Sequence, residues 1–268
     1  MKLFSMQLAR IMKRRSYFAR RVYNYITFLK NNFDNLDFDM TSNGELNVIK
    51  RLQLGSGDVV LDVGGNEGDW TLAVLGNSAA TTIYAFEVVP ATRTIFSRNV
   101  NSEFVTLLPY GLGEVERELE MFVDPDDTGK STSSVSLADR RSGFSKKPIS
   151  CRVAVGDQVL DSLGISHVRL LKIDVEGAES QVLSGFKQAF CNNKIDIVQF
   201  EYGEVCLDTR YLLQDFYRFF ESNGFVVGKI YPTFVDFKDY EYSDENFLGS
   251  NFLAVRKNLI RDIERLSR

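Results

Sequence analysis

Short apolar runs alternate with longer amphipathic segments through the middle of the chain, and this pattern predicts strands and helices in turn. The short runs are rich in Val, Ile and Leu, which is typical of strands buried on both faces of a parallel sheet. The predicted strands are 59–63, 82–86, 105–108, 168–173, 195–200, 225–231 and 251–256. The predicted helices are 45–54, 70–76, 90–101, 178–190 and 211–222.

Repeated strand–helix units predict an α/β fold: a doubly wound, mostly parallel sheet of seven strands with helices on both faces. The last two strands follow one another without a helix, which predicts one antiparallel strand near that edge. We expect residues 1–45 to form a helical extension and linker, 46–258 the main domain and 259–268 a tail.

The segment 113–155 interrupts this alternation. Residues 118–123 alternate as a half-exposed strand does, and 149–155 have the pattern of its partner. A polar loop containing Ser131 lies between them, and long insertions of this kind are usually functional or mobile. We therefore expect this loop to be a lid that contacts cofactor or acceptor.

Charge is distributed unevenly along the chain. Residues 1–30 contain eight Lys and Arg and no acid, among regularly spaced apolar residues. Since the chain has 32 Lys and Arg and 36 Asp and Glu, 24 basic residues remain in the body against all 36 acids. An acidic body argues against a nucleic-acid partner, because phosphate contacts supply most of that affinity.

The basic N-terminal segment allows three interpretations. It lacks the run of about 20 apolar residues that spans a bilayer. We favour a helix that packs its apolar stripe on the domain. The alternatives are a helix lying on an anionic membrane surface, which would place the protein peripherally at the inner membrane, and a transit peptide. The three cysteines lack zinc spacing and a disulfide framework, so we expect reduced thiols and a cytoplasmic protein.

A glycine-rich turn follows the first strand and predicts a nucleotide-type site. Asp62 lies at the end of this strand, and Gly64, Gly65 and Gly68 allow a tight turn whose N–H groups face a ligand. Glu87 ends the second strand, where an acid hydrogen-bonds ribose hydroxyls in doubly wound folds.

The spacing of the glycines distinguishes between ligands. Counting from Gly64, Asn66 and Asp69 replace the second and third glycines of the dinucleotide pattern, and an acid there would repel a pyrophosphate. The chain also has no P-loop sequence. A ligand with an amino group and no phosphate suits Asp62 better, and S-adenosylmethionine is such a ligand.

Three segments resemble a known enzyme family. Residues 62–68 and 85–90 resemble the first two motifs of class I S-adenosylmethionine-dependent methyltransferases, and 171–179, Leu-Lys-Ile-Asp-Val-Glu-Gly-Ala-Glu, resembles the hallmark of the FkbM family. The chain departs from the family pattern at Gly65, at Val88-Val89 and at Gly113-Glu114. The resemblance implies methyl transfer to a hydroxyl oxygen, often of a sugar or polyketide. The expected cofactor-binding residues are Asp62, Gly64, Gly65, Asn66, Gly68, Glu87, Val88, Leu112 and Asp174.

Carboxylates follow the fourth and fifth predicted strands at the edge where active sites of this fold lie. Asp174 and Glu176 come after the fourth strand and Glu201 after the fifth, so we expect a general base or an orienting group among them. The same three residues could instead hold a divalent cation such as Mg²⁺, which we do not expect. Lys172 shares a strand face with Asp174 and is expected to form an ion pair, with a catalytic lysine as the alternative. His167 lies at the opposite end of its strand.

Acceptor residues are expected in the same region. Tyr202 follows Glu201, and the loop 231–242 alternates aromatic and charged residues, with Tyr231 and Phe234 as its candidates alongside Ser131 of the earlier loop. A partly buried connection between two strands is the alternative interpretation of that loop.

The sequence as a whole predicts an O-methyltransferase that acts on a carbohydrate or another small hydroxylated molecule. N-methylation and RNA ribose methylation are the alternatives among enzymes. A non-catalytic cofactor-binding or membrane-associated partner protein is the alternative from another class.

Overall fold

The structure is a computed structural model, and it describes residues 12–13, 15–124, 131–132, 145 and 147–268. The strands of its main sheet are β1 (Val59–Val63), β2 (Thr82–Phe86), β3 (Val105–Leu108), β8 (Val168–Ile173), β9 (Ile195–Tyr202), β10 (Phe225–Ile230), β11 (Val235–Phe237) and β12 (Ser250–Arg256). Their spatial order is β11-β10-β12-β9-β8-β1-β2-β3. The order reverses at β1 and β8, which is where ligands bind in doubly wound folds.

The sheet confirms the predicted fold class and corrects its strand number. Strands β3, β2, β1, β8 and β9 run parallel, and β12 is antiparallel to both of its neighbours, β9 and β10. The sheet has eight strands rather than seven, because β11 pairs antiparallel with β10 as a hairpin. This strand comes from the aromatic loop at 231–242, where no strand was predicted.

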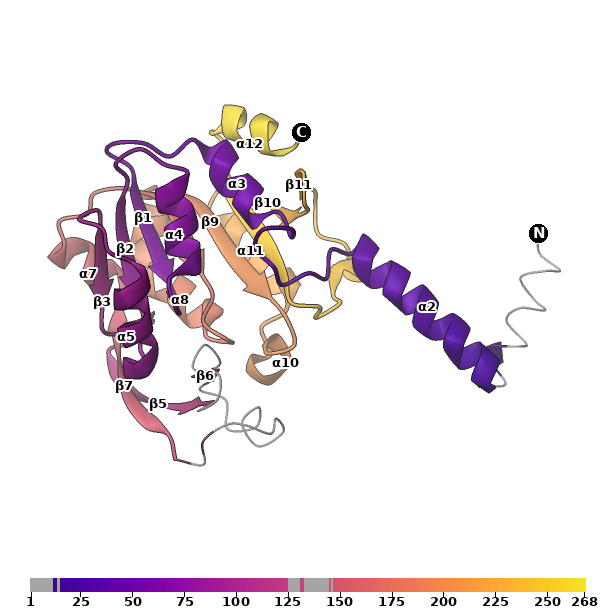
Figure 1. The fold of residues 1–268 in the computed structure, drawn as a ribbon. Helices are drawn as coiled ribbons and strands as arrows, with labels where there is room; N and C mark the ends of the chain where they lie inside the picture. The colour runs from indigo at the N-terminus through magenta and orange to yellow at the C-terminus, as the bar shows by residue number, and fades with distance from the viewer. Residues whose placement is uncertain (1–11, 14, 125–130, 133–144, 146) are drawn as a thin grey trace.

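Helices cover both faces of the sheet, as the figure shows (Figure 1). They are α3 (Glu45–Leu52), α4 (Asp69–Gly76), α5 (Pro90–Asn99), α7 (Gly156–Ser162), α8 (Glu179–Gly185), α9 (Lys187–Cys191), α10 (Cys206–Thr209), α11 (Leu213–Ser222) and α12 (Ile260–Leu266). The single helix predicted over 178–190 is divided into α8 and α9. At Gly185 the chain passes so close to a neighbouring strand that a Cβ would lie 2.2 Å from the carbonyl oxygen of Gly113.

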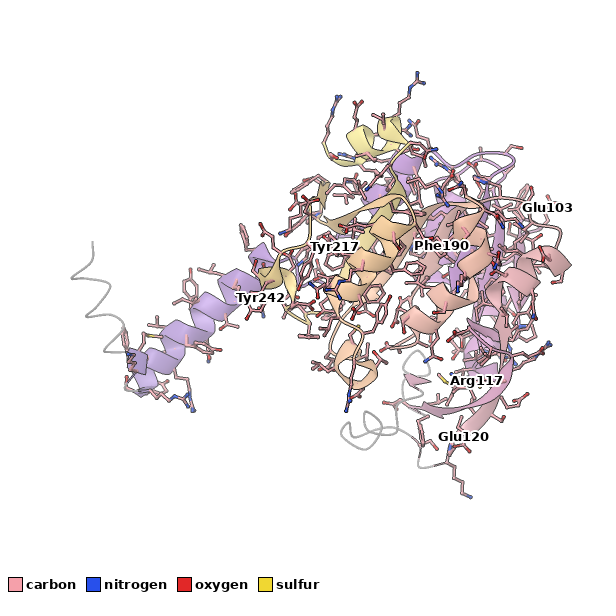
Figure 2. The ribbon with its side chains drawn as sticks, turned by 180° about the vertical axis from the view of Figure 1, so that it is seen from behind. Glu103, Arg117, Glu120, Phe190, Tyr217 and Tyr242 are labelled. Carbon is pink, nitrogen blue, oxygen red and sulfur yellow. The ribbon has the colours of Figure 1, made fainter. Side chains whose placement is uncertain are left out.

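Neighbouring side chains of β1 contribute to two different hydrophobic clusters on opposite faces of the sheet. Val60 points to the cluster that contains α3, α4 and α12, and Leu61 points to the cluster beneath α7, α8, α9 and α11. Phe190 and Tyr217 belong to the second cluster and are seen from behind the sheet (Figure 2). This division is the physical basis of the doubly wound architecture, since every central strand buries both faces.

A second, smaller sheet follows β3. It consists of β4 (Gly111–Gly113), β5 (Arg117–Val123), β6 (Ser131–Thr132) and β7 (Ile149–Val155), in the order β4-β7-β5-β6. The predicted pairing of 118–123 with 149–155 is confirmed, because β5 and β7 pair antiparallel.

The N-terminal helix α2 (Tyr17–Phe33) projects away from the domain (Figure 1). Ala19 is its only buried residue, whereas Tyr17 and Phe33 are 77% and 81% exposed. The expectation that this helix packs its apolar stripe on the domain is therefore wrong for the described residues. No helix in the described part of the chain combines the length and apolar character needed to cross a membrane.

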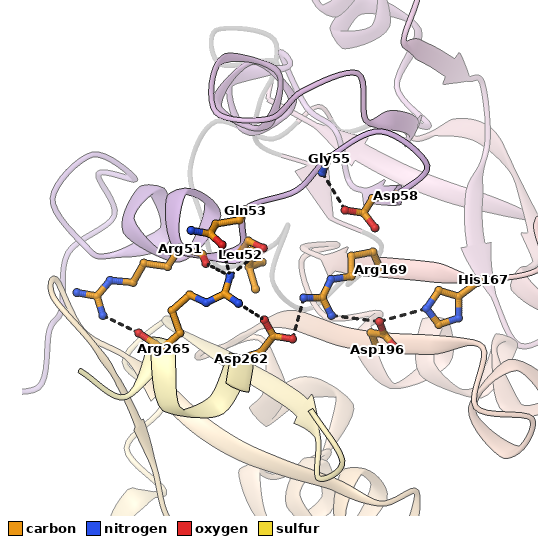
Figure 3. A network of polar contacts seen from close by, with 10 residues as sticks. All are labelled: Arg51, Leu52, Gln53, Gly55, Asp58, His167, Arg169, Asp196, Asp262 and Arg265. Carbon is orange, nitrogen blue, oxygen red and sulfur yellow. Dashed lines mark hydrogen bonds and ion pairs between the residues drawn. The ribbon is translucent and has the colours of Figure 1, made fainter. Parts of the chain in front are cut away.

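A polar network ties the C-terminal helix to the end of the sheet where β8 and β9 begin (Figure 3). The guanidinium of Arg169, at the start of β8, contacts Asp196 at 3.1 Å and Asp262 at 2.8 Å. Arg265 of α12 donates to the carbonyl oxygen of Arg51 at the end of α3. His167 contacts Asp196 at 3.1 Å, which confirms its place at the end of the sheet opposite the predicted site.

Removal of the central arginine should destabilise the fold. Arg169→Ala removes the cation that bridges two largely buried carboxylates. Among the described residues it leaves Asp196 with only His167 and Asp262 with only Arg265 as charged partners, so we expect the free energy of unfolding to fall by about 3 kcal/mol in urea titrations. Arg261→Ala, which removes an exposed arginine from α12, should change it by less than about 0.5 kcal/mol. Equal effects of the two substitutions would contradict a structural role for the network.

Candidate active site

The turn between β1 and α4 can only be made with glycine. Gly64 has φ +89°, and a Cβ there would lie 1.8 Å from the carbonyl oxygen of Asp174. The N–H groups of Gly64 and Gly65 both donate to the carbonyl oxygen of Phe86, at 3.0 and 2.9 Å. These contacts hold the turn against the ends of both neighbouring strands, β2 and β8.

Glu87 presents a carboxylate at the end of β2. Its two oxygens accept hydrogen bonds from the N–H groups of Asn66, at 3.0 Å, and Val89, at 2.7 Å. Burial raises the pKa of Glu87, and the two backbone donors oppose this rise. Each carboxylate oxygen retains a lone pair for a further donor, so the group can accept from two neighbouring hydroxyls, as a ribose offers.

A cavity lies between this carboxylate and the smaller sheet. Its lining combines apolar side chains, Val88, Leu112, Met121 and Val153, with polar residues, Asn66, Glu87, Asp174 and Glu176. A flat aromatic base suits the apolar side chains and a ribose suits the polar ones. Six of the predicted cofactor residues line it, namely Gly64, Asn66, Glu87, Val88, Leu112 and Asp174.

Asp62 does not face this cavity. It is fully buried beneath the turn, where one oxygen accepts from the Thr71 hydroxyl at 2.7 Å and the other lies 3.5 Å from the ammonium nitrogen of Lys172. The structure therefore gives Asp62 two protein partners in place of a direct contact with an amino group of the ligand. Gly68 also belongs to the turn: it has a left-handed backbone conformation and is the N-cap residue immediately before α4.

Lys172 is the buried cation at the centre of the site. Its ammonium nitrogen lies 3.2 Å from Asp174 and 5.6 Å from the centre of the Trp70 ring. Burial alone would lower the pKa of Lys172, but the charges of Asp174 and Asp62 outweigh burial and raise it. The predicted ion pair is confirmed, and a lysine held charged in this way cannot serve as a base near neutral pH.

The predicted catalytic carboxylates lie close enough to interact. Burial raises the pKa of Glu201 well above its ordinary value, and the charges of three neighbouring carboxylates raise it further. These neighbours are Asp174, Glu176 and Glu179. Glu176 has φ +52°, and strained backbone of this kind often occurs at functional sites. Within the described residues, no group of three or more His, Cys, Asp or Glu side chains is arranged to hold a metal ion.

A groove adjoins the cofactor cavity and shares Asn66 and Asp174 with it. Phe38 and Glu45, which the sequence reasoning missed, line this groove with Trp70 and Lys172. The Glu45 carboxylate accepts hydrogen bonds from Asn43, Gln199 and Asn251 at 2.7, 2.6 and 3.0 Å. The sequence offered one signal for Glu45: Gln199 lies inside a buried strand, where a polar side chain requires a hydrogen-bonding partner.

The predicted acceptor residues lie elsewhere. Tyr202 is fully buried, and its hydroxyl donates to Glu245. Tyr231 and Phe234 stack on one another, with ring centres 5.2 Å apart, at the turn between β10 and β11, and neither lines the cavity or the groove. Ser131 pairs through its backbone with Val123, and its side chain lies outside the described part of the chain.

The chain is similar in sequence to known methyltransferases. Residues 62–227 match the methyltransferase FkbM domain. Methyltransferase 1 of Beauveria bassiana is 30% identical over 185 residues, which cover 63% of this chain and 72% of that protein. Hexuronic acid methyltransferase AglP of Haloferax volcanii is 30% identical over 176 residues, covering 64% and 69%. The crystal structure of precorrin-6y C5,15-methyltransferase from Geobacter metallireducens is similar over 78% of this chain and 86% of its own, with a TM-score of 0.43 and 13% identity.

The match to the FkbM domain extends over more than half of the chain. It includes the glycine turn, the acid after β2, the carboxylates after β8 and Glu201 at the end of β9. The chain therefore belongs to the FkbM family of methyltransferases.

Proposed function

We propose that the protein transfers the methyl group of S-adenosylmethionine to a hydroxyl oxygen of a carbohydrate or a similar small hydroxylated molecule. One observation carries this proposal: a cavity lined by Glu87, Val88 and Leu112 shares Asn66 and Asp174 with a second groove, beside a cluster of interacting carboxylates. The name of the Haloferax relative, a hexuronic acid methyltransferase, supports a carbohydrate acceptor.

The chain offers a distinct contact to each part of the cofactor. Val88 and Leu112 would enclose the adenine, and Glu87 would accept hydrogen bonds from the ribose hydroxyls. The amino-acid arm would extend past Asn66 and Asp174 toward the groove. When bound, S-adenosylmethionine supplies an electrophilic methyl group on a positively charged sulfur, and the surrounding carboxylates favour that charge.

Glu201 is the best-suited base: it lines neither the cavity nor the groove itself, but its carboxylate lies close to Phe38, which lines the groove. The acceptor oxygen forms a bond to the methyl carbon as the carbon–sulfur bond breaks, and the hydroxyl proton must leave the oxygen. A carboxylate whose pKa is raised toward the working pH accepts a proton more readily than an ordinary glutamate does. Asp174, held by Lys172, would orient the hydroxyl. Methylation of RNA is disfavoured because the body of the chain is acidic.

We also propose that α2 lies on an anionic membrane surface. Phe18, Val22, Ile26 and Leu29 follow helical spacing on one side of the projecting helix. The helix and the residues before it contain basic side chains and no acid, so two copies would repel one another, whereas anionic lipids would attract them.

Loss of the ribose contact should weaken cofactor binding. Glu87→Gln removes a charged acceptor, so we expect calorimetry to show about 10- to 100-fold weaker binding of S-adenosylmethionine and of its demethylated product. Glu103→Gln, an exposed acid outside the cavity, should bind both as the wild type does. If the folded wild-type protein bound neither compound, the proposed function would be wrong.

Loss of the base should reduce turnover and alter its pH dependence. Because the base must be deprotonated and its pKa is raised, the wild-type kcat should increase with pH and level off above the pKa of Glu201. Glu201→Gln should lower kcat about 10²- to 10⁴-fold, abolish this rise and leave cofactor affinity unchanged. Glu221→Gln, on the exposed side of α11, is the matched control. If turnover survived in both Glu201→Gln and Asp174→Asn with normal cofactor binding, this assignment would fail.

Membrane binding can be tested with two double variants of equal charge. The full-length protein should float with vesicles that contain phosphatidylglycerol and not with pure phosphatidylcholine. Ile26→Asp with Leu29→Asp should abolish flotation, because the charges lie on the apolar face. Asn24→Asp with Asn31→Asp adds the same charge on the polar face, and this variant should retain most of the wild-type flotation. Absence of wild-type flotation, or equal loss in both variants, would count against a membrane-bound apolar face.

A further inference from the structure

Phe38 is an exposed aromatic residue in the connection between α2 and α3. It is 75% exposed, yet it lines the groove beside the cofactor cavity. An aromatic ring with most of its surface in water contributes little to the folded core. The role of Phe38 must therefore be inferred from its position relative to the carboxylates of the site.

The ring of Phe38 lies beside Glu201. A Cβ placed on Gly249 would be 3.0 Å from the edge of the Phe38 ring and 3.3 Å from a carboxylate oxygen of Glu201. The ring and the oxygen are therefore no farther apart than the sum of these two distances. A six-membered ring lying on Phe38 would have its hydroxyl groups within reach of Glu201.

The connection that carries Phe38 is firmly braced. The side-chain amide of Asn35 donates to the carbonyl oxygens of Asn43, at 2.7 Å, and of Ile230, at 3.0 Å. Gly44 has φ +107° and packs so closely on Tyr231 that a Cβ would lie 2.2 Å from its carbonyl oxygen. The segment is thus attached to the sheet on both sides of Phe38, and the ring is held in place over the groove.

The groove is strongly negative. Lys172 is the only cation among the described residues that line it, and its charge is already matched by Asp62 and Asp174. The acidic side chains that line the groove are Asp39, Glu45, Glu67, Asp69 and Asp174. An acceptor that carries its own carboxylate would be repelled here, whereas neutral hydroxyl groups can donate hydrogen bonds to these oxygens.

We propose that Phe38 is the platform on which the acceptor ring lies, and that the groove selects an uncharged sugar ring over a uronic acid. This inference rests on the proposed function and specifies its substrate class. The apolar C–H face of a sugar would cover the exposed ring of Phe38, since the positive C–H edges favour the negative face of an aromatic. The acids around it would accept from the sugar hydroxyls.

The charge preference can be tested with matched acceptors. Wild-type protein is incubated with radiolabelled S-adenosylmethionine and with methyl glycosides of glucose, galactose and mannose or of the corresponding uronic acids. We expect label in a neutral hexoside, at least about 10-fold faster than in its uronide, and a smaller ratio at high salt because salt screens exposed charges. Equal or faster labelling of uronides would overturn the proposal, as would no labelling of any glycoside by protein that binds the cofactor. Failure to bind the cofactor in calorimetry would instead identify a failure of the proposed function.

The role of Phe38 can be tested on the labelled hexoside. Phe38→Ala should lower kcat/KM at least about 10-fold, mainly through KM, with unchanged cofactor affinity and thermal stability. Phe38→Tyr and Phe38→Trp should retain most of the wild-type kcat/KM, because each keeps an aromatic face. Phe104→Ala, which removes an exposed phenylalanine before β3, should behave as the wild type does. An unchanged KM in Phe38→Ala, or equal loss in Phe38→Trp, would overturn the assignment.

Discussion

The buried ammonium group of Lys172 holds the centre of this protein together. It lies between Asp62 of β1 and Asp174 after β8, and Trp70 covers it. Because Asp62 and Lys172 are register partners in adjacent parallel strands, the charge pair aligns the two strands at the point where the sheet order reverses. A charge in this position is tolerated only with its partners in place, so the local geometry has little freedom.

Acidic side chains gather near this cation. Glu45 and Glu201 both have raised pKa values with burial as the first cause, and the charge of Lys172 opposes the rise in each case. Such an arrangement costs folding free energy, because carboxylates in a poorly solvated cluster repel one another. Perturbed groups of this kind concentrate at functional sites, and here they surround the place where a positively charged methyl donor would be held.

Segments outside the main sheet line both the cavity and the groove. The smaller sheet contributes apolar side chains to the cofactor cavity, and the connection before α3 contributes Phe38 and neighbouring residues to the groove. Glu45 links that connection to β9 and β12 through Gln199 and Asn251. The main sheet therefore supplies only part of the cofactor cavity, and segments outside it shape the acceptor side.

The sequence by itself determined the buried strands, the glycine turn, the acid after β2 and the family. These features are local: β1, β2, β3 and β8 are short segments made mostly of apolar residues, and Gly64 is needed because a Cβ there would collide with the carbonyl oxygen of Asp174. Only the tertiary structure decided that Asp62 lies behind the turn, that α2 projects from the domain, and that Phe38 and Glu45 line the groove. Those outcomes depend on contacts such as Glu45 with Gln199, between residues 154 positions apart, and no local pattern of apolar and polar residues encodes such a pairing.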